Sequence, residues 1–272
     1  MNIDKFLEFA LAEDIGRGDL FSKVQSSVSA KGFILAKSDG VLAGQKYANR
    51  LAELQDFSIE WKFQDGDRFQ KGDILLKISG TSHILMQSER VLLNIILHTS
   101  SIATLTRKYV EKVENFNTRI LDTRKTRPLL RDLEKYATQV GGAINHRMGL
   151  DDSLMLKDTH LKTLTDLDSF LKNARKKIPF TAKIEVEAET VEFAKKVILK
   201  DVDIVMCDNM KPDEVLEVVK FRNSQNSRVL LEASGNMNLN TVLDYAKTGV
   251  DAISVGSIIH QANWIDLSMK IQ

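Results

Sequence analysis

Residues Asp122–His160 read DTRKTRPLLRDLEKYATQVGGAINHRMGLDDSLMLKDTH and concentrate charge around two predicted strands. The first strand is predicted over Thr118–Asp122 (TRILD), so Arg124 and Lys125 follow directly at its C-terminal end. Between Arg124 and Lys157 the chain holds seven Arg or Lys residues against four Asp or Glu. Because these cations follow a strand end, where loops carry binding residues, the stretch predicts a local site for anions.

A helix is predicted after the first strand, over Pro128–Val140, where apolar residues recur at helical spacing and proline suits the first turn. The glycine pair at 141–142 then stops the helix. His146 and Arg147 lie in the loop that follows. A second apolar strand, Leu154–Leu156, again delivers charge at its end. We therefore expect two strand ends to converge on one cationic site.

Other charged residues of this stretch have ordinary explanations. Arg131, Glu134 and Lys135 lie within the predicted helix, and we expect them to be solvated there. Asp122 is expected to orient the loop or to pair with a neighbouring base. His98 is expected to be structural, whereas the position of His146 between Asn145 and Arg147 favours a direct ligand.

The string TRKTRPLLRDLEKYA, followed by GGAINHRMGL and LKDTH, closely resembles the pattern DTRKT-x-PGLR…EKYA…GG-x-NHR-x-GL…KDNH. That pattern belongs to the quinolinate phosphoribosyltransferases, also called carboxylating nicotinate-nucleotide pyrophosphorylases. The resemblance continues in LAEDIGRGDLFS near the start and VDAISVGSIIHQA near the end. It therefore covers nearly the whole sequence through specific motifs.

Three positions depart from the family pattern. Arg127 stands where many members have a smaller polar residue, Leu129 where they have Gly, and Thr159 where Asn is common. The role of Arg127 stays open, because it either raises the positive potential of the site or pairs with an acid.

After Val113 predicted strands and helices alternate, which favours a parallel sheet with right-handed crossovers. No G-x-G-x-x-G follows the first strand, so an incomplete or modified β/α barrel over residues 103–272 is favoured over an open nucleotide-binding sheet. An N-terminal α+β sandwich domain is predicted over residues 1–102. The strands are predicted at Thr118–Asp122, Ser153–Lys157, Thr181–Glu187, Asp203–Met206, Arg228–Glu232 and Asp251–Val255.

The predicted strands end in residues able to touch a phosphate, a ribose or a metal. Barrel enzymes build their sites at this C-terminal face, often with phosphate bound by backbone N–H groups after the last strands. Glu185 and Glu187 share a strand face; the family alignment favours Glu187 and leaves Glu185 open. The strand-end residues are Arg124, Lys125, Lys157, Glu187, Asp208, Ser234, Gly235, Asn236, Gly256 and Ser257.

The resemblance implies that quinolinate and 5-phosphoribosyl-1-pyrophosphate give nicotinate mononucleotide, pyrophosphate and carbon dioxide, a step of de novo NAD biosynthesis. Quinolinate is a dianion, so basic residues are expected to neutralise its carboxylates and position its ring nitrogen. Thr123 and Val255 lie within the motifs that resemble the family, so they are also expected to bind substrate. The expected carboxylate ligands are Arg124, His146, Arg147 and Lys157.

Catalytic roles are also implied by the resemblance. Lys125 is expected on the pyrophosphate side. Glu187 and Asp208 are expected to stabilise the positive ribose, hold its hydroxyls, or bind the Mg²⁺ that screens pyrophosphate. Lys125, Lys157, Glu187 and Asp208 are therefore the predicted catalytic residues, and Mg²⁺ is the expected cofactor.

The N-terminal part adds one predicted site residue. Arg90, in SERVLLN, is implied to reach the substrate pocket of the neighbouring subunit, so we expect a homodimer with shared sites. Whether dimers assemble further stays open. The turns of Asp65–Gly80 also occur in lipoyl and biotinyl carrier domains, but no modifiable Lys stands at a hairpin tip, which disfavours a carrier.

Composition excludes several classes of protein. A net charge of +1 argues against nucleic-acid binding driven by bulk charge. The single cysteine, Cys207, excludes a disulfide within the chain and gives no zinc cluster. No apolar run is long enough to span a bilayer, and acids in MNIDKFLEFALAEDI argue against a signal peptide. We therefore expect a soluble cytoplasmic protein with no membrane partner.

Three other functions are weighed against the transferase. A pyrophosphorylase-like protein of molybdate-transport loci shares the fold, but the full set of basic residues argues against it. A non-carboxylating nicotinate phosphoribosyltransferase needs fewer cationic partners. A non-enzymatic sensor would bind phosphoribosyl pyrophosphate without turnover. The sequence leaves the kinetic constants and the order of substrate binding open.

Overall fold

The structure is a computed structural model that describes residues 2–272. The chain forms two compact units, each built from separate segments. Unit 1 comprises the described residues up to Arg107, together with Arg127–Gly142 and Gln261–Gln272. Unit 2 comprises Lys108–Thr126 and Ala143–His260.

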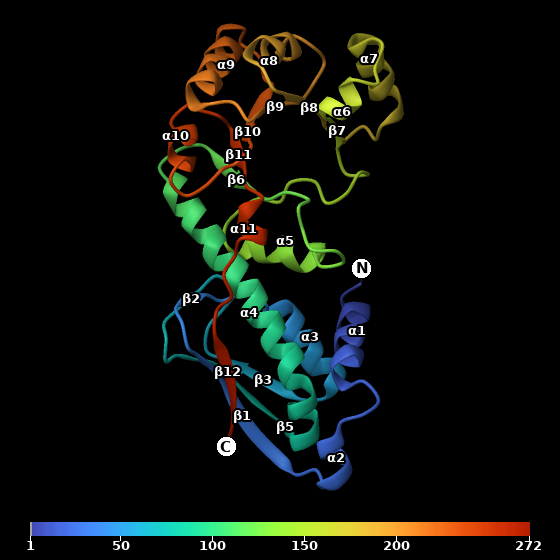
Figure 1. Ribbon diagram of the computed structural model, residues 1–272, viewed down its shortest axis with the longest axis vertical. Coiled ribbons are helices and arrows are strands. Elements are labelled where there is room, and N and C mark those ends of the chain that lie inside the picture. The colour runs from blue at the N-terminus through green and yellow to red at the C-terminus, as the bar shows by residue number, and fades with distance from the viewer. Residues whose placement is uncertain (1) are drawn as a thin grey trace. The chain divides into compact units, whose positions relative to one another are not determined.

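Unit 2 is built on a six-stranded parallel sheet in the order β6-β11-β10-β9-β8-β7 (Figure 1). From β7 to β11, each strand pairs with the next strand in the sequence. The first strand, β6, pairs with the last, β11, as in a barrel. The sheet is open between β6 and β7, which lie at its two edges. Six strands are fewer than the eight of a complete β/α barrel, so the predicted incomplete barrel is confirmed. The strands are β6 (Arg119–Leu121), β7 (Leu154–Leu156), β8 (Ile184–Ala188), β9 (Ile204–Asp208), β10 (Leu230–Ser234) and β11 (Ala252–Ser254).

Helices connect these strands, and α7, α8 and α9 begin at residues suited to a helix N-terminus. Thr190 accepts a hydrogen bond from the Phe193 N–H at the start of α8, and Asp166 does the same for the Ser169 N–H of α7. Pro212 occupies the first turn of α9, where its missing N–H costs nothing. The helices are α6 (Asp158–Leu161), α7 (Leu167–Lys177), α8 (Val191–Ile198), α9 (Pro212–Ser224), α10 (Val242–Ala246) and α11 (Ser257–His260).

Burial of the sheet identifies its unusual residues. All five residues of β8 are buried, as expected for parallel strands covered on both faces. Such strands are normally apolar, yet β8 carries Glu185 and Glu187, and β10 carries Glu232. A charged group is buried only where it is paired or functional, so these three carboxylates point to the site.

Unit 1 contains a four-stranded antiparallel sheet in the order β12-β1-β5-β3 and a two-stranded ribbon, β2-β4. The sheet packs with the helices around an apolar core that includes Leu7, Leu51 and Leu92. The strands are β1 (Ser29–Ala36), β2 (Gly40–Val41), β3 (Ser58–Trp61), β4 (Arg68–Phe69), β5 (Ile74–Thr81) and β12 (Leu267–Ile271). The helices are α1 (Ile3–Ile15), α2 (Leu20–Val24), α3 (Gln45–Gln55), α5 (Arg131–Val140) and the part of α4 (Ser82–Val113) that ends at Arg107.

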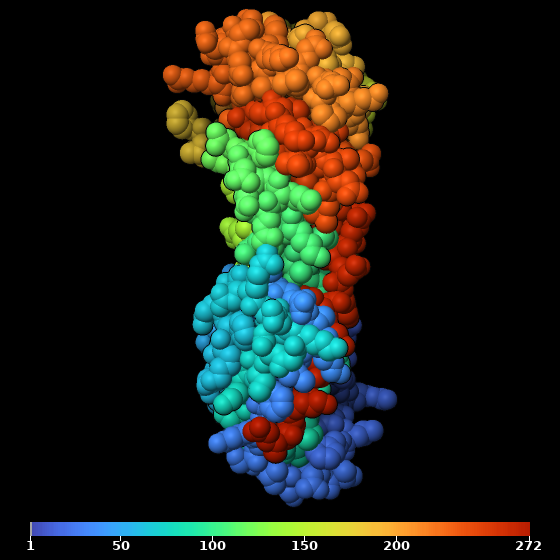
Figure 2. Space-filling model, turned by 90° about the vertical axis from the view of Figure 1, so that its left-hand side faces the viewer, coloured from blue at the N-terminus to red at the C-terminus, as the bar shows by residue number. Residues whose placement is uncertain are grey.

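Strand β12 was not predicted from the sequence. It pairs antiparallel with β1, with Ile34 opposite Met269. Figure 2 shows these C-terminal residues, in red, seated among the blue and cyan residues of unit 1. The short segment LSMKI gives little strand signal by itself, because its partner lies far away in the sequence.

Helix α4 is one continuous helix of 32 residues. Near its middle, the hydroxyls of Thr99 and Ser101 donate to helix carbonyls at Ile95 and Leu97, so these polar residues do not interrupt the helix. The predicted boundary at residue 102 therefore falls inside a helix, and it stays a prediction. No helix among residues 2–272 combines the length and the apolar character needed to cross a membrane.

Candidate active site

A cavity of about 530 Å³ lies in unit 2, where the carboxyl ends of the parallel strands meet. Every strand of the sheet contributes lining residues at or just beyond its end. The structure thus gathers most of the site residues predicted from the sequence. Those that line the cavity are Thr123, Arg124, Lys125, His146, Arg147, Lys157, Glu187, Asp208, Ser234, Gly235 and Asn236.

Basic side chains come from three loops. Arg124 and Lys125 follow β6, Arg147 lies in the loop before β7, and Lys157 follows β7. The Lys157 Nζ lies 3.1 Å from the Glu187 Oε2, which keeps the ammonium group against the acidic side of the cavity. No single element carries these cations, so the positive potential arises only where the strand ends meet.

The acidic side of the cavity is formed by Glu187 and Asp208, at the ends of adjacent strands. Burial raises the pKa of Glu187, the ion pair with Lys157 opposes that rise, and the nearby charge of Asp208 adds to it. Asp208 accepts a hydrogen bond of 2.7 Å from the Asn209 side chain. Two carboxylates that face one cavity offer the oxygen ligands that Mg²⁺ prefers.

The turn after β10 requires glycine. Gly235 has φ +99°, and a Cβ at this position would lie 2.2 Å from the Asn209 Oδ1. The Asn209 N–H also donates to the Ser234 carbonyl at 2.9 Å. Asn209 and Asn236 themselves adopt positive φ values of 55° and 50°. Backbone therefore approaches backbone closely at this edge of the cavity, and only glycine leaves room for it.

Val255, Gly256 and Ser257 are not among the residues that line the cavity. Gly256 lies beside it, because a Cβ there would meet the Lys125 Cδ at 3.2 Å and the Thr123 Oγ1 at 3.5 Å. The Ser257 hydroxyl lies 3.1 Å from the Tyr109 hydroxyl. The predicted contacts of these three residues with substrate stay predictions.

Asp122 is wholly buried and orients the loop that carries His146. Its carboxylate accepts the His146 backbone N–H at 2.8 Å and the Asn145 side-chain amide at 2.5 Å. The loop itself has almost no regular secondary structure. The predicted orienting role of Asp122 is therefore confirmed.

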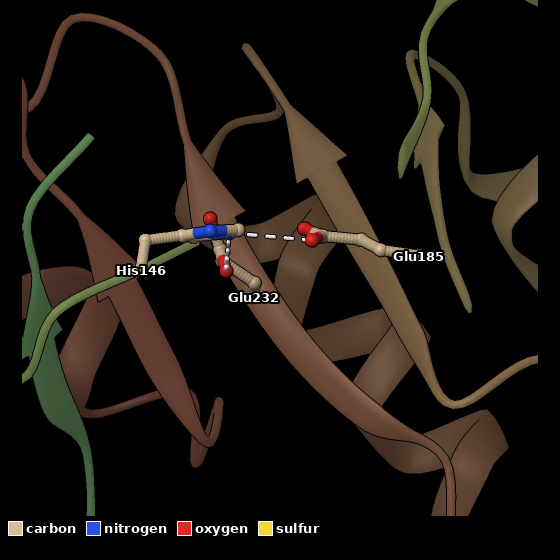
Figure 3. A group of neighbouring side chains, drawn as sticks. All are labelled: His146, Glu185 and Glu232. Atoms are coloured by element: carbon tan, nitrogen blue, oxygen red, sulfur yellow. Dashed lines mark ion pairs between the residues drawn. The ribbon is translucent and has the colours of Figure 1, made fainter. Parts of the chain in front are cut away.

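The imidazole of His146 lies between two buried carboxylates, Glu185 of β8 and Glu232 of β10 (Figure 3). Its Nε2 is 3.2 Å from the Glu185 Oε2 and 3.3 Å from the Glu232 Oε2. Burial lowers the pKa of His146, but hydrogen bonds to both carboxylates outweigh it and raise that pKa to about 10. Burial raises the pKa of Glu185. Both shifts mean that these three residues together hold one proton firmly.

Glu232 and Asn209 also line the cavity, although neither was predicted from the sequence as a site residue. Glu232 stands two residues before Ser234 in the apolar strand LLEAS, so strand periodicity places it on the same face as a predicted ligand. That signal was sufficient to find it. No such signal marks Asn209. It follows β9 and contacts Gly235, which follows β10, so its position at the cavity depends on a contact between two different strand ends.

Arg90 belongs to unit 1 and does not line the cavity of unit 2. It lines a different cavity of about 450 Å³, together with His98, Arg127 and Trp264. The predicted role of Arg90 concerns a neighbouring subunit, so it stays a prediction.

The expectation that Glu134 and Lys135 are solvated is wrong, because both are completely buried. Glu134 accepts hydrogen bonds from the His98 Nε2 at 3.0 Å, the Arg127 Nη1 at 2.7 Å and the Arg127 N–H at 2.9 Å. Tertiary partners therefore compensate the burial of this charge. Arg127, one of the departures from the family pattern, pairs with an acid in unit 1.

Family models match most of the chain. Residues 19–100 match the N-terminal domain of quinolinate phosphoribosyl transferase, and residues 102–270 match its C-terminal domain. A probable carboxylating nicotinate-nucleotide pyrophosphorylase of Synechocystis sp. is 40% identical over 99% of this chain and 92% of the relative. The protein of the same name from Bacillus subtilis is 36% identical, over 100% and 94% of the two chains.

A solved structure shows the same fold. NadC from Streptococcus pyogenes superposes with a TM-score of 0.92 at 36% identity, over 99% of this chain and 96% of that one. The strand-end cavity, the matching motifs and these similarities agree with one another. The chain belongs to the quinolinate phosphoribosyltransferase family.

Proposed function

We propose that the cavity of unit 2 is where this chain transfers a phosphoribosyl group to quinolinate and releases carbon dioxide. The observation that carries this proposal is the meeting of four basic side chains, Arg124, Lys125, Arg147 and Lys157, with three carboxylates in one cavity. The reactants require both, since quinolinate brings two negative charges and the ribose becomes positive as pyrophosphate leaves. The product, nicotinate mononucleotide, serves NAD biosynthesis.

Quinolinate is proposed to lie against Arg124, Arg147 and Lys157. Guanidinium and ammonium groups form charge-assisted hydrogen bonds with carboxylates. Such bonds would neutralise the two carboxylates of quinolinate and also hold its ring in one orientation. The family resemblance also assigns His146 to this group. In a homodimer, Arg90 of the second copy would add one more cation.

Phosphoribosyl pyrophosphate is proposed to lie at the opposite strand ends. Backbone N–H groups of Ser234–Asn236 and Val255–Ser257 would hold the 5-phosphate, with Thr123 beside them. Lys125 would contact the pyrophosphate. Glu187 and Asp208 would hold the ribose hydroxyls and stabilise the positive charge that develops at the anomeric carbon.

The reaction then needs no nucleophilic side chain. The ring nitrogen forms its bond to the anomeric carbon while the bond from that carbon to the pyrophosphate oxygen breaks. The carboxyl group beside the nitrogen leaves as carbon dioxide, and its electron pair stays on the ring carbon, which takes a proton. The positive ring nitrogen stabilises that electron pair, so the side chains act by positioning and by charge.

Magnesium is the proposed cofactor. The carboxylates of Glu187 and Asp208 both face the cavity, and oxygen ligands of this kind fit Mg²⁺. When bound, the ion would screen the charge of pyrophosphate and so make it a better leaving group. Lys157 limits the negative charge of Glu187, because it pairs with that carboxylate.

We also propose that the protein acts as a cytoplasmic homodimer. Phosphoribosyl pyrophosphate carries several negative charges and does not cross a membrane unaided, which supports a site inside the cell. A dimer would bring Arg90 to the other copy's cavity. Sedimentation of the purified chain tests whether it is a dimer. The quinolinate affinity of Arg90→Ala tests whether Arg90 contributes to the substrate site, and a weaker affinity is expected.

The proposed reaction is tested by carbon dioxide release from quinolinate labelled in the 2-carboxyl group, with phosphoribosyl pyrophosphate and Mg²⁺. Equal amounts of carbon dioxide and nicotinate mononucleotide are expected from the wild type. Arg147→Ala is expected to lower kcat/KM for quinolinate by about 10- to 100-fold, because it removes a charge-assisted hydrogen bond.

Arg228→Ala is the matched control, since Arg228 is exposed and lies outside the cavity. This variant is expected to keep wild-type kinetics. Binding of phosphoribosyl pyrophosphate without carbon dioxide release by the wild type would contradict the proposed reaction and favour a sensor. Turnover of nicotinate in place of quinolinate would favour the non-carboxylating transferase.

A further inference from the structure

The hydroxyl groups of Tyr109 and Ser257 lie 3.1 Å apart within unit 2. Tyr109 belongs to the part of α4 that lies in unit 2, and it is only 3% exposed. Ser257 opens α11, just after β11. A buried tyrosine hydroxyl normally has a hydrogen-bond partner, and Ser257 provides it here. The contact therefore joins a helix that precedes the sheet to the turn that follows its last strand.

The direction of this hydrogen bond follows from the number of protons. The Ser257 Oγ also lies 3.3 Å from the Met237 carbonyl oxygen, which can only accept a hydrogen bond. A hydroxyl group has one proton, so Ser257 donates it to Met237 and accepts the proton of Tyr109. Tyr109, Ser257 and the Met237 carbonyl thus form a hydroxyl bridge of two hydrogen bonds in series.

The hydroxyl bridge connects two strand ends. Met237 follows directly after the turn Ser234–Asn236 at the end of β10. Ser257 belongs to the turn Val255–Ser257 at the end of β11. The sheet pairing between β10 and β11 comprises two residue pairs and stops before either turn. The hydroxyl bridge therefore extends the connection between these strands as far as the turns, where the 5-phosphate is proposed to bind.

The Ser257 hydroxyl is not the donor that a phosphate would use. Phosphate oxygens accept hydrogen bonds, and the single proton of the Ser257 Oγ is already directed at the Met237 carbonyl. By contrast, the backbone N–H groups of Gly256 and Ser257 donate to no other group within residues 2–272. This turn would therefore bind the 5-phosphate through its backbone, while the Ser257 side chain determines where that backbone lies.

Apolar packing, rather than the hydroxyl bridge, anchors this part of the chain. Val255, Ile258 and Ile259 are 1%, 0% and 0% exposed. Burial of three apolar side chains contributes more to stability than one neutral hydrogen bond does. Removal of either hydroxyl is therefore expected to leave unit 2 folded and to change only the exact position of the two turns.

We propose that Tyr109 and Ser257 are positioning residues for the 5-phosphate of phosphoribosyl pyrophosphate. The Tyr109 hydroxyl fixes the Ser257 side chain, and Ser257 fixes the turn after β11 against the turn after β10. Neither hydroxyl contacts the substrate. This inference rests on the proposed function, because it takes from it the position of the 5-phosphate.

Ribose 5-phosphate and pyrophosphate, the two parts of the substrate, separate this role from a general structural one. Calorimetry measures the Kd of each, the second with Mg²⁺, for the wild type, Tyr109→Phe and Ser257→Ala. Each variant is expected to bind ribose 5-phosphate about three- to tenfold more weakly, the effect of one neutral hydrogen bond. Pyrophosphate affinity is expected to stay within about twofold. Equal weakening of both ligands, or no weakening of either, would overturn the inference.

Steady-state kinetics of the same variants give an independent measurement. KM for phosphoribosyl pyrophosphate is expected to rise about three- to tenfold, with kcat and the KM for quinolinate within about twofold of the wild type, because the 5-phosphate is distant from the bonds that change. A fall in kcat with an unchanged KM for phosphoribosyl pyrophosphate would contradict the inference.

The double variant of Tyr109→Phe with Ser257→Ala distinguishes a positioning role from a direct contact. It is expected to bind ribose 5-phosphate no more weakly than Ser257→Ala, because Tyr109 acts through Ser257 and such effects are not additive. Losses that multiply would overturn the inference. So would a loss in Ser257→Ala with none in Tyr109→Phe, since that result requires a hydroxyl that binds the phosphate directly.

Tyr47→Phe is the matched control, because Tyr47 is a buried tyrosine of unit 1, 4% exposed, that does not line the cavity. It is expected to keep both Kd values, and thermal unfolding checks the fold of all variants. An equal loss in Tyr47→Phe would count against the inference.

The two proposals can fail separately. If wild-type protein releases no carbon dioxide from quinolinate, the proposed reaction fails, yet the Kd of ribose 5-phosphate still decides the role of Tyr109 and Ser257. If the wild type is active and its variants bind ribose 5-phosphate normally, only the inference fails.

Discussion

Leu129 is the residue at which this chain departs from its family at a conformational cost. It has φ +65° and its side chain is 76% exposed, so no burial compensates the left-handed backbone. Left-handed conformations cost a non-glycine residue roughly 1–2 kcal/mol, whereas glycine adopts them freely. This left-handed backbone explains why glycine is usual at this position in the family. The sequence pattern alone did not give that explanation.

Leu129→Gly is expected to raise the free energy of unfolding by about 0.5–1 kcal/mol, because it relieves this strain by more than glycine's extra chain entropy costs. Leu199→Gly is the control, since Leu199 is also exposed but has φ −84°; it is expected to destabilise by a similar amount. Urea unfolding of the two variants measures both. Destabilisation of both variants alike would rule out strain at Leu129.

At the scale of elements, α5 illustrates how tertiary contacts override a helix pattern. The charged residues of RDLEKYATQV predict a solvated helix, but Glu134 is buried and pairs with the buried His98 and the exposed Arg127. Burial raises the pKa of Glu134, yet the hydrogen bonds from His98 and Arg127 outweigh it, so the folded pKa lies below the ordinary value of 4.5. Glu134 therefore stabilises the folded chain when it is ionised.

Glu134→Gln is expected to lower the free energy of unfolding by about 2 kcal/mol at pH 7, because a charge-assisted network is lost. A lowered folded pKa contributes stability above the unfolded pKa, near 4.5, and loses it as pH falls through the folded value. The difference between variant and wild type should therefore shrink below about pH 4.5. Glu217→Gln, in an exposed pair with Lys195, is the control and is expected to cost under about 0.5 kcal/mol. A pH-independent difference would contradict the ionic explanation.

At the scale of the whole molecule, the C-terminal strand stabilises the N-terminal sheet. Leu267 and Met269 of β12 are buried in the core of unit 1, whereas Ile271 of the same strand is 42% exposed. Leu267→Ala is expected to cost about 2–4 kcal/mol, and Ile271→Ala under about 1 kcal/mol. Hydrogen exchange should show faster opening of β1 amides in Leu267→Ala. Unchanged β1 protection in a destabilised variant would mean that β12 does not stabilise this sheet.

Local sequence patterns predicted the alternation of strands and helices, the cations that follow β6 and β7, and the family. These features are local, because strand periodicity, glycine turns and contiguous motifs depend on residues that are close together in the sequence. For the same reason the strand-end positions of Glu187, Asp208 and Ser234 could be predicted from the sequence alone.

By contrast, the buried charges that meet in the folded chain could not be predicted from local patterns. Glu185, Glu232 and His146 come from three separate segments, and no pattern in any one of them shows that their side chains converge. The same holds for Glu134 with His98, for β12 with β1, and for Gly235 with Asn209. Each depends on contacts between residues distant in the chain, and such contacts are fixed by packing of the whole unit rather than by local propensity.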